Sequence, residues 1–481
     1  MLMASPQWMF ETDLPEDIIS NSLRFNDGDS AHLTFTPGSA SSATDRRKIT
    51  HSVWVKRGAL GTGTTLYSST KSGGSDYYQW RFSSDDKMTL ILDVDDSNFG
   101  YDTEAVFRDT TNWYHFVLII DTTQSTNTDR VKLYANGVLQ TLNTKYAGGH
   151  VSQNFETYVM DGTEDAIGEF NYNSSTYFDG YMAEFVTTIG QNTAVTDFGK
   201  DVDGVWLPKD TSGLTFGGNG FRLQFKQTGT STDASGMGAD TSGNTNHFAP
   251  VNLAASDVVI DTPENNFCTI NFQAQSLTST VTSVEGNLFF DGSTLSPSNY
   301  DAGVLCNFGM KGGRWYWETR LSGGGTSADA RDWNVGFAPY STASKSVDDG
   351  TYGQSLGHGS SATLSGYGYT QVNGGGTHGI RHNNSTTAFG SAHTSGDILG
   401  HALDLVNGTW QIYKNGTLLG TAVTGLDTSL TYFAAGGANG GTISSFDVTF
   451  NFGQDDTFAG AVSSNGNTGG GGKFRYTPPA G

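Results

Sequence analysis

Closely spaced acidic residues are the first candidates for chemistry in this sequence. Asp93, Asp95 and Asp96 follow an apolar run, and the alternation of an extended chain would place Asp93 and Asp95 on one face. Hard carboxylate oxygens suit calcium, so Ca²⁺ is one possible ligand here. A solvated acidic turn between two strands explains the same residues, and we favour that interpretation. We therefore assign no metal site and no cofactor from the sequence.

Bond cleavage in a glycan requires two carboxyl groups that face each other about 5 Å apart in a retaining enzyme. The segment from Glu164 through Asp165 to Glu169 has acids at the wrong spacing to project from one face of a strand. No third acid follows Asp93 and Asp95 in register. The sequence also lacks a phosphate-binding Gly-x-x-x-x-Gly-Lys-Ser/Thr loop and a Gly-x-Ser-x-Gly turn. We predict no catalytic residue and a protein that is not an enzyme.

Aromatic residues outside the predicted strands are candidates for ligand contact, because sugars stack on flat apolar rings framed by polar groups. The candidates lie in a Gly-rich region of the second half, where Arg381 adds a charge between His378 and His382: they are Trp333, Tyr352, Tyr367, Tyr369 and Arg381. The two histidines are four residues apart without a helical pattern, so we interpret them as surface residues. Most other aromatics, such as Trp113 and Trp410, alternate within strands and are expected in the core.

Charge and composition exclude several classes of protein. The 481 residues carry 26 basic and 48 acidic side chains, a net charge of −22, which repels phosphate backbones and makes nucleic acid an unsuitable ligand. Cys268 and Cys306 are the only cysteines and are expected to be buried as small hydrophobic residues. No apolar run approaches the ~20 residues of a membrane span. The first residues lack the pattern of a secretory signal, so we expect synthesis in a cytoplasm and no membrane insertion.

Short alternating runs dominate the chain and predict an all-β fold. In the run over residues 49–57, Ile49, His51, Val53 and Val55 fall on one face and Trp54 on the other. Asn-Gly at 136–137 lies between alternating apolar residues, which predicts a two-residue hairpin, and the same Tyr-x-Asn-Gly-x-Leu pattern recurs at 413–418. Many short strands with regular turns favour sandwiches of antiparallel sheets. With 64 glycines, the chain is well supplied with turn residues.

The pattern divides the chain into two antiparallel, jelly-roll-like β-sandwiches joined by a partly extended connector. The expected parts are an N-terminal arm over 1–22, a first sandwich over 23–190, a connector with some strand content over 191–285, a second sandwich over 286–460 and a Gly-rich tail over 461–481.

The second sandwich resembles a SPRY domain. The segments that carry the resemblance, in the order of that family, are 313–318 (GRWYWE), 335–338 (VGFA), 396–404 (GDILGHALD), 413–416 (YKNG) and 450–454 (FNFGQ). The first sandwich resembles a laminin-G-like, concanavalin-type jelly roll, through residues 53–56 (VWVK), 113–116 (WYHF), 133–137 (LYANG) and 178–181 (FDGY). Both resemblances imply a binding protein whose loops contact the ligand. Some jelly rolls of this type are glycoside hydrolases, but their Glu-x-Asp-x-x-Glu motif is absent here.

Two further segments are similar to proteins of marine tailed phages: residues 240–248 (DTSGNTNHF) with 256–267, and the ending 474–481 (FRYTPPAG). The resemblance implies a virion protein, tail fibre-like or adhesin-like, that binds a host-surface glycan or protein and other virion proteins. It also implies a homo-oligomer, with a trimer favoured. A capsid decoration or tail accessory subunit is the alternative, and a glycan depolymerase is a second alternative.

Overall fold

The computed structural model describes residues 18–71, 76–93, 98–275, 283–291, 301–322, 333–339, 366–371, 378–383, 385–439, 447–466 and 472–479. Strands make up 45% of the structure and helices 4%, which confirms the predicted all-β fold. The helices of the described part are short 3-10 turns: η1 (Asp27–Asp29), η2 (Asp45–Arg47), η3 (Asn127–Asp129), η4 (Val195–Asp197) and η5 (Ala255–Asp257). In this part of the chain no helix is long and apolar enough to cross a membrane.

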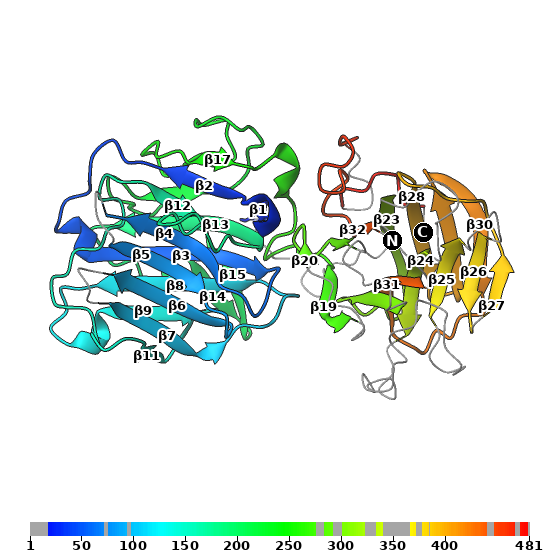
Figure 1. Cartoon of the computed structure of the whole chain (residues 1–481), viewed down its shortest axis with the longest axis horizontal. Coiled ribbons are helices and arrows are strands. Elements are labelled where there is room, and N and C mark those ends of the chain that lie inside the picture. The colour runs from blue at the N-terminus through cyan, green and yellow to red at the C-terminus, as the bar shows by residue number, and fades with distance from the viewer. Residues whose placement is uncertain are drawn as a thin grey trace. The chain divides into compact units, whose positions relative to one another are not determined.

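The described residues form two compact units, which divide between Asn266 and Phe267. The first unit is a sandwich of two eight-stranded antiparallel sheets (Figure 1). Its first sheet contains, in spatial order, β10 (Val138–Leu139), β9 (Val131–Ala135), β8 (Tyr114–Asp121), β3 (Lys48–Arg57), β13 (Gly180–Ile189), β1 (Ser22–Phe25) and β18 (Val258–Val259), with β16 (Phe221–Leu223) also paired to β13. Its second sheet contains β11 (Leu142–Thr144), β7 (Phe99–Val106), β6 (Lys87–Asp93), β5 (Tyr77–Phe82), β4 (Thr64–Thr70), β12 (Asp165–Ile167), β2 (His32–Phe35) and β17 (Ala249–Val251).

Strand β3 lies at the centre of the first sheet and follows the predicted alternation. Ile49, Val53 and Val55 point into the core between the sheets, whereas Trp54 packs in a separate cluster on the other face. His51 also points inward, where its ring lies 4.6 Å from that of Tyr67 and its Nδ1 is 2.8 Å from the Thr187 hydroxyl. Burial lowers the pKa of His51 to about 3, so this side chain is a neutral part of the core.

The two Asn-Gly hairpins form as the sequence predicts. Asn136 and Gly137 have φ values of 48° and 77°, and Asn415 and Gly416 have values of 50° and 80°. Positive φ at both central residues matches the right-handed twist of the flanking strands, which is why asparagine and glycine occupy these positions.

The segment expected as a connector differs from that description, because most of it belongs to the first sandwich. After residue 190 the chain adds β16 and β18 to the first sheet and β17 to the second sheet. It also forms the hairpin of β14 (Gly199–Val202) and β15 (Val205–Pro208), whose Trp206 indole donates to His115 Nδ1 at 2.9 Å. These strands are only two to four residues long, so their periodicity in the sequence is weak.

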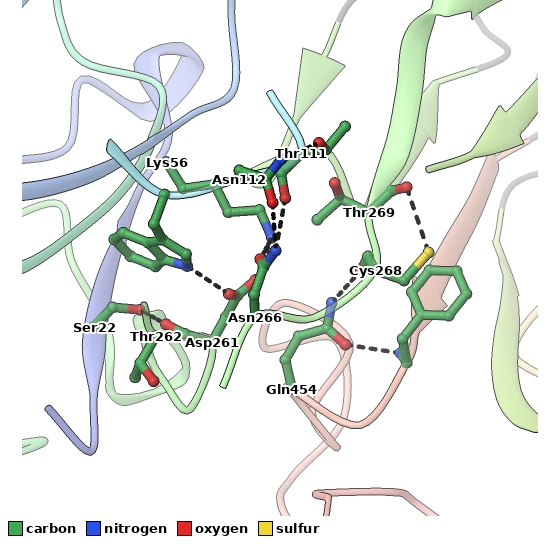
Figure 2. Close-up of polar contacts among 12 residues, drawn as sticks. Ser22, Lys56, Thr111, Asn112, Asp261, Thr262, Asn266, Cys268, Thr269 and Gln454 are labelled. Carbon is green, nitrogen blue, oxygen red and sulfur yellow. Dashed lines mark hydrogen bonds and ion pairs between the residues drawn. The ribbon is translucent and has the colours of Figure 1, made fainter. Parts of the chain in front are cut away.

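A buried ion pair fixes the end of this segment within the first unit. Lys56 Nζ lies 2.8 Å from Asp261 Oδ2 and 2.8 Å from the Asn266 side-chain oxygen (Figure 2). The Trp113 indole donates to Asp261 Oδ1 at 3.0 Å. Lys56 is 1% exposed and Asp261 is fully buried, so each charge depends on its partners. A second ion pair, Arg24–Asp257 at 3.0 Å, ties the same segment to β1.

The second unit is a sandwich of two seven-stranded antiparallel sheets (Figure 1). One sheet contains β19 (Ile270–Gln275), β22 (Asp301–Cys306), β31 (Tyr432–Asn439), β24 (Trp333–Pro339), β25 (Tyr367–Gln371), β26 (His378–His382) and β27 (Ser385–Ala388). The other contains β20 (Ser283–Val284), β21 (Phe289–Asp291), β32 (Asp447–Asn451), β23 (Arg314–Ser322), β28 (Ile398–Asp404), β29 (Thr409–Lys414) and β30 (Thr417–Thr424).

Aromatic rings fill the core of the second unit. The His401 ring stacks on Trp317 at 4.9 Å and lies 5.8 Å from Trp410. Cys268 and Cys306 are both free thiols and both buried, as the sequence predicts. The Cys268 carbonyl accepts from the Gln454 amide at 3.0 Å (Figure 2). Burial, together with the neighbouring Cys268 thiol, raises the pKa of Cys306, so Cys306 does not favour a reactive thiolate.

Part of the predicted C-terminal tail is anchored on the second unit. The Glu318 carboxylate accepts from the backbone N–H groups of Arg475 and Tyr476, both at 2.8 Å. Asn451 donates to Glu318 Oε2 at 3.1 Å and to the Lys473 carbonyl at 2.9 Å. Phe474 is 4% exposed, and its ring packs edge-on against that of Tyr316 on β23, with 5.0 Å between the ring centroids. Residues 472–479 form no strand, so a carboxylate on strand β23 accepts the hydrogen bonds of two of their backbone N–H groups in place of a neighbouring strand.

Candidate functional site

A group of aromatic residues that includes the exposed Tyr172 lies on the outer face of the second sheet of the first unit. Along β5, Tyr78, Trp80 and Phe82 point into the core, so Tyr77 and Arg81 point outward. Directly opposite Tyr77 in the ladder stands Asp93, the last residue of β6. A sheet holds these side chains at fixed spacing, which is what a preformed binding face requires.

The turn after β12 brings two more rings to Tyr77. Its ring centroid is 4.8 Å from that of Phe170 and 5.2 Å from that of Tyr172. Tyr172 is 44% exposed, and Tyr77 is half-buried. Tyr146 covers Gly100 on β7, where a Cβ would come within 2.7 Å of the tyrosine ring, so glycine is needed for that contact. We call Tyr77, Tyr146, Phe170 and Tyr172 the tyrosine face.

Charged groups frame the tyrosine face. Partial burial raises the pKa of Tyr77, Asp93 and Tyr146 add to this effect, and Arg81 opposes it. The hydroxyl of Tyr77 therefore stays protonated and remains a hydrogen-bond donor at neutral pH. Farther along the same face, Lys145 pairs with Asp102 at 2.8 Å. Flat rings beside an arginine and carboxylates provide both stacking surface and hydrogen bonds for a polyhydroxylated ligand.

The acids between Glu164 and Glu169 do not lie together on this face. Asp165 is fully buried and accepts from the Tyr67 hydroxyl at 2.5 Å, and burial raises its pKa to about 8. Glu169 is 4% exposed and pairs with His32 Nε2 at 3.0 Å. Each of these two acids thus has a structural partner inside the fold.

The possible calcium ligands are only partly described. Asp93 ends β6, whereas Asp95 and Asp96 lie outside the described residues. Within the part of the chain that the structure describes, no three His, Cys, Asp or Glu side chains gather as a metal site.

Four of the five candidate binding residues of the second unit lie on strands rather than in loops. The fifth, Tyr352, lies outside the described residues. Trp333 is the first residue of β24. Tyr369 on β25 is fully buried and its hydroxyl donates to the Ser391 carbonyl at 2.5 Å, so it is a core residue. Tyr367 is partly exposed and stacks on His382 with 3.9 Å between ring centroids. Arg381 follows the inward-pointing Ile380 on β26 and so occupies the opposite face of the sheet. The structure therefore separates Tyr369 from Arg381.

The sequence did not lead to the tyrosine face, because only aromatic residues in predicted loops were taken as candidates for ligand contact. The signal was nonetheless present. In the run from Tyr77 to Phe82, every second residue is a core aromatic, which leaves Tyr77, the buried Gln79 and Arg81 on the outer face of the sheet. Tyr172 could not be linked to Tyr77 by any pattern, since 94 residues separate them and only the turn after β12 brings them together.

Two family models match the chain. Residues 27–187 match the concanavalin A-like lectin/glucanases superfamily, and residues 314–455 match the SPRY domain. These matches confirm both of the domains predicted from the sequence. The second model begins at the first residue of β23. Residues 188–313 lie outside both matches and include the segment that completes the first sandwich.

Two solved structures match parts of the chain. The SPRY domain of human HERC1 is 15% identical, with a TM-score of 0.29, and the match covers 38% of this chain and 96% of that one. A heptameric SAP-like pentraxin from Limulus polyphemus is 17% identical, with a TM-score of 0.28, and the match covers 37% of this chain and 80% of that one. No curated protein matches the chain. The two domains indicate a binding function, for protein or glycan.

Proposed function

We propose that this chain, which carries a concanavalin A-like domain followed by a SPRY domain, is an attachment protein of a tailed phage particle. It binds a host-surface glycan through the tyrosine face of its first unit. The observation that carries the binding proposal is the exposure of Tyr172 beside Tyr77, with Asp93 directly opposite Tyr77 in the ladder. The protein acts without catalysis, since the proposed face offers aromatic stacking rather than a pair of facing acids.

The virion assignment is supported by the phage-like segments at 240–248 and 256–267 and by the ending at 474–481. Several copies in one particle, such as a trimer, would compensate for a weak single site, because linked sites gain avidity. Antibodies against the chain should label the tail tips of intact particles in electron micrographs. Labelling spread over the capsid would instead support a decoration subunit.

Tyr172→Ala is expected to weaken binding to host polysaccharide by about twofold to tenfold, since one lost stacking ring is worth roughly 0.5–1.5 kcal/mol. Tyr77→Ala should have a similar effect. The measurement is retention of the purified chain on immobilised host polysaccharide, quantified by biolayer interferometry.

Tyr172→Phe keeps the ring and should keep most of the binding. Tyr413→Ala, which removes a tyrosine of the second unit, serves as the matched control and should bind like the parent chain. Equal binding by Tyr172→Ala, Tyr77→Ala and the parent would contradict the role of the tyrosine face. Release of reducing sugar from the polysaccharide would show catalysis and overturn the non-enzymatic proposal.

A further inference from the structure

A cavity of about 130 Å³ opens on the first unit in the segment that follows β16. Phe225, Met237 and Ala239 form its apolar floor and are between 0% and 7% exposed. Gln224 and Lys226 line its rim. These residues lie outside both family matches. The cavity therefore uses none of the residues of the tyrosine face.

The wall of this cavity is built by tight backbone contacts. A Cβ at Gly236 would lie 1.8 Å from the Ser231 carbonyl oxygen, and one at Gly238 would lie 2.2 Å from that of Phe248. Only glycine fits these contacts. Phe225 adopts a φ of 55°, a conformation that is unfavourable for a bulky residue and that the surrounding loop must impose.

Asp240 locks the opposite wall. Its Oδ1 accepts from the backbone N–H groups of Arg222 and Ser242 at 2.9 and 2.8 Å, and its Oδ2 accepts from that of Asn246 at 2.9 Å. The carboxylate is thus engaged by the protein itself. A cavity held in this way exists before a ligand arrives, which reduces the ordering cost of binding.

The rim presents hydrogen-bond donors above an apolar floor. Lys226 is exposed, and its Nζ lies 3.3 Å from the Gln224 amide when the amide oxygen faces it. An ammonium group carries three N–H donors, so two remain for a ligand, and the Gln224 NH₂ adds further donors. Gln227 and Thr241 are also exposed at the rim. A fitting ligand has a carbonyl acceptor next to a small apolar group.

The volume of the cavity limits the size of the ligand group that can enter it. Its volume of about 130 Å³ is similar to that of the roughly 150 Å³ cavity known to bind benzene, so it admits a small group of a few non-hydrogen atoms. An acetamido group has four non-hydrogen atoms: a nitrogen, a carbonyl carbon, an oxygen and a methyl carbon. Its carbonyl would accept from Lys226 and Gln224 while its methyl contacts Met237 and Ala239.

We propose that this cavity binds the acetamido group of an N-acetylated amino sugar. The proposal adds a second sugar site to the function proposed above and rests on that function for the choice of a sugar over other acetylated molecules. The sugar ring itself would lie at the exposed rim, near Gln227 and Thr241.

Saturation-transfer NMR with N-acetylglucosamine and the full chain tests this proposal. The acetyl methyl protons are expected to receive the strongest saturation, whereas glucose and glucosamine at equal concentration should show little. Ala239→Leu fills the floor and should reduce the methyl signal at least about fivefold. Lys226→Met, at an exposed position, should also weaken it and does not depend on core packing.

Thr228→Ala alters an exposed residue beyond the cavity lining and is the matched control, with an unchanged signal expected. Tyr172→Ala should also leave the signal unchanged, which separates this site from the tyrosine face. Saturation that persists in both Ala239→Leu and Lys226→Met would overturn the proposal. So would binding of an acetyl-lysine peptide in place of the sugar.

Discussion

Replacing Asp261 by alanine is expected to lower the free energy of unfolding of the first unit by about 3–5 kcal/mol. Without the carboxylate, the Lys56 ammonium stays 1% exposed and loses its charge partner, and the Trp113 indole loses its acceptor. Breaking one side of a buried ion pair costs more than a surface pair contributes, because the remaining charge cannot reach water. Urea unfolding followed by near-UV circular dichroism measures the change.

Asp201→Ala, at an exposed position on β14, is the control and should change stability by less than about 0.5 kcal/mol. A truncated chain of residues 18–190 should fail to show a cooperative transition, whereas residues 18–266 should unfold cooperatively. If the shorter piece folds as well as the longer one, the segment after residue 190 is a connector after all.

Replacing Glu318 by alanine is expected to free the C-terminal segment from the second unit, at a cost of about 3 kcal/mol. The backbone N–H groups of Arg475 and Tyr476 and the Asn451 amide would lose a buried acceptor. Hydrogen exchange of the Arg475 and Tyr476 amides, resolved by mass spectrometry, should accelerate strongly. Asp427→Ala removes an exposed acid of the same unit and should leave that exchange unchanged.

The same glutamate gives a pH dependence with a defined sign. Burial raises the pKa of Glu318 from 4.5 to about 7, although its four hydrogen-bond donors oppose this. The folded state therefore binds the proton more tightly than the unfolded state, so this residue's contribution to stability is largest below pH 4.5 and is lost as pH rises through 7. In Glu318→Gln this dependence should disappear. A free energy of unfolding of the parent chain that stays constant between pH 4.5 and 7 would contradict this prediction.

The sequence allowed prediction of the elements whose pattern is local. The alternation in β3 and the two Asn-Gly hairpins depend on neighbouring residues alone, and they form as expected. The partners of Asp261 could not be predicted, since Lys56 is 205 residues away and no periodicity links them. For the same reason the tyrosine face, which joins β5 to the turn after β12, could be found only in three dimensions.

Candidate binding residues in the second unit were harder to place. Tyr367 and Tyr369 belong to a strand of only five residues in a Gly-rich region, and so short a strand is easily taken for a loop. Once the strand forms, alternation with Gly368 directs both tyrosines to the same face, and one of them becomes part of the core. The exposure of an aromatic residue is therefore decided by strand register, which composition does not reveal.

The position of β1 between β13 and β18 determines when the first unit can fold during synthesis. Strand β1 leaves the ribosome before the other described strands of this unit, yet its two neighbours begin at residues 180 and 258. One edge must wait for 155 further residues and the other for 233. Pairing over such separations is slow because closing a long loop costs entropy. We expect the nascent chain to need protection from association until Asp261 has emerged, so that expression yield should respond to chaperone supply.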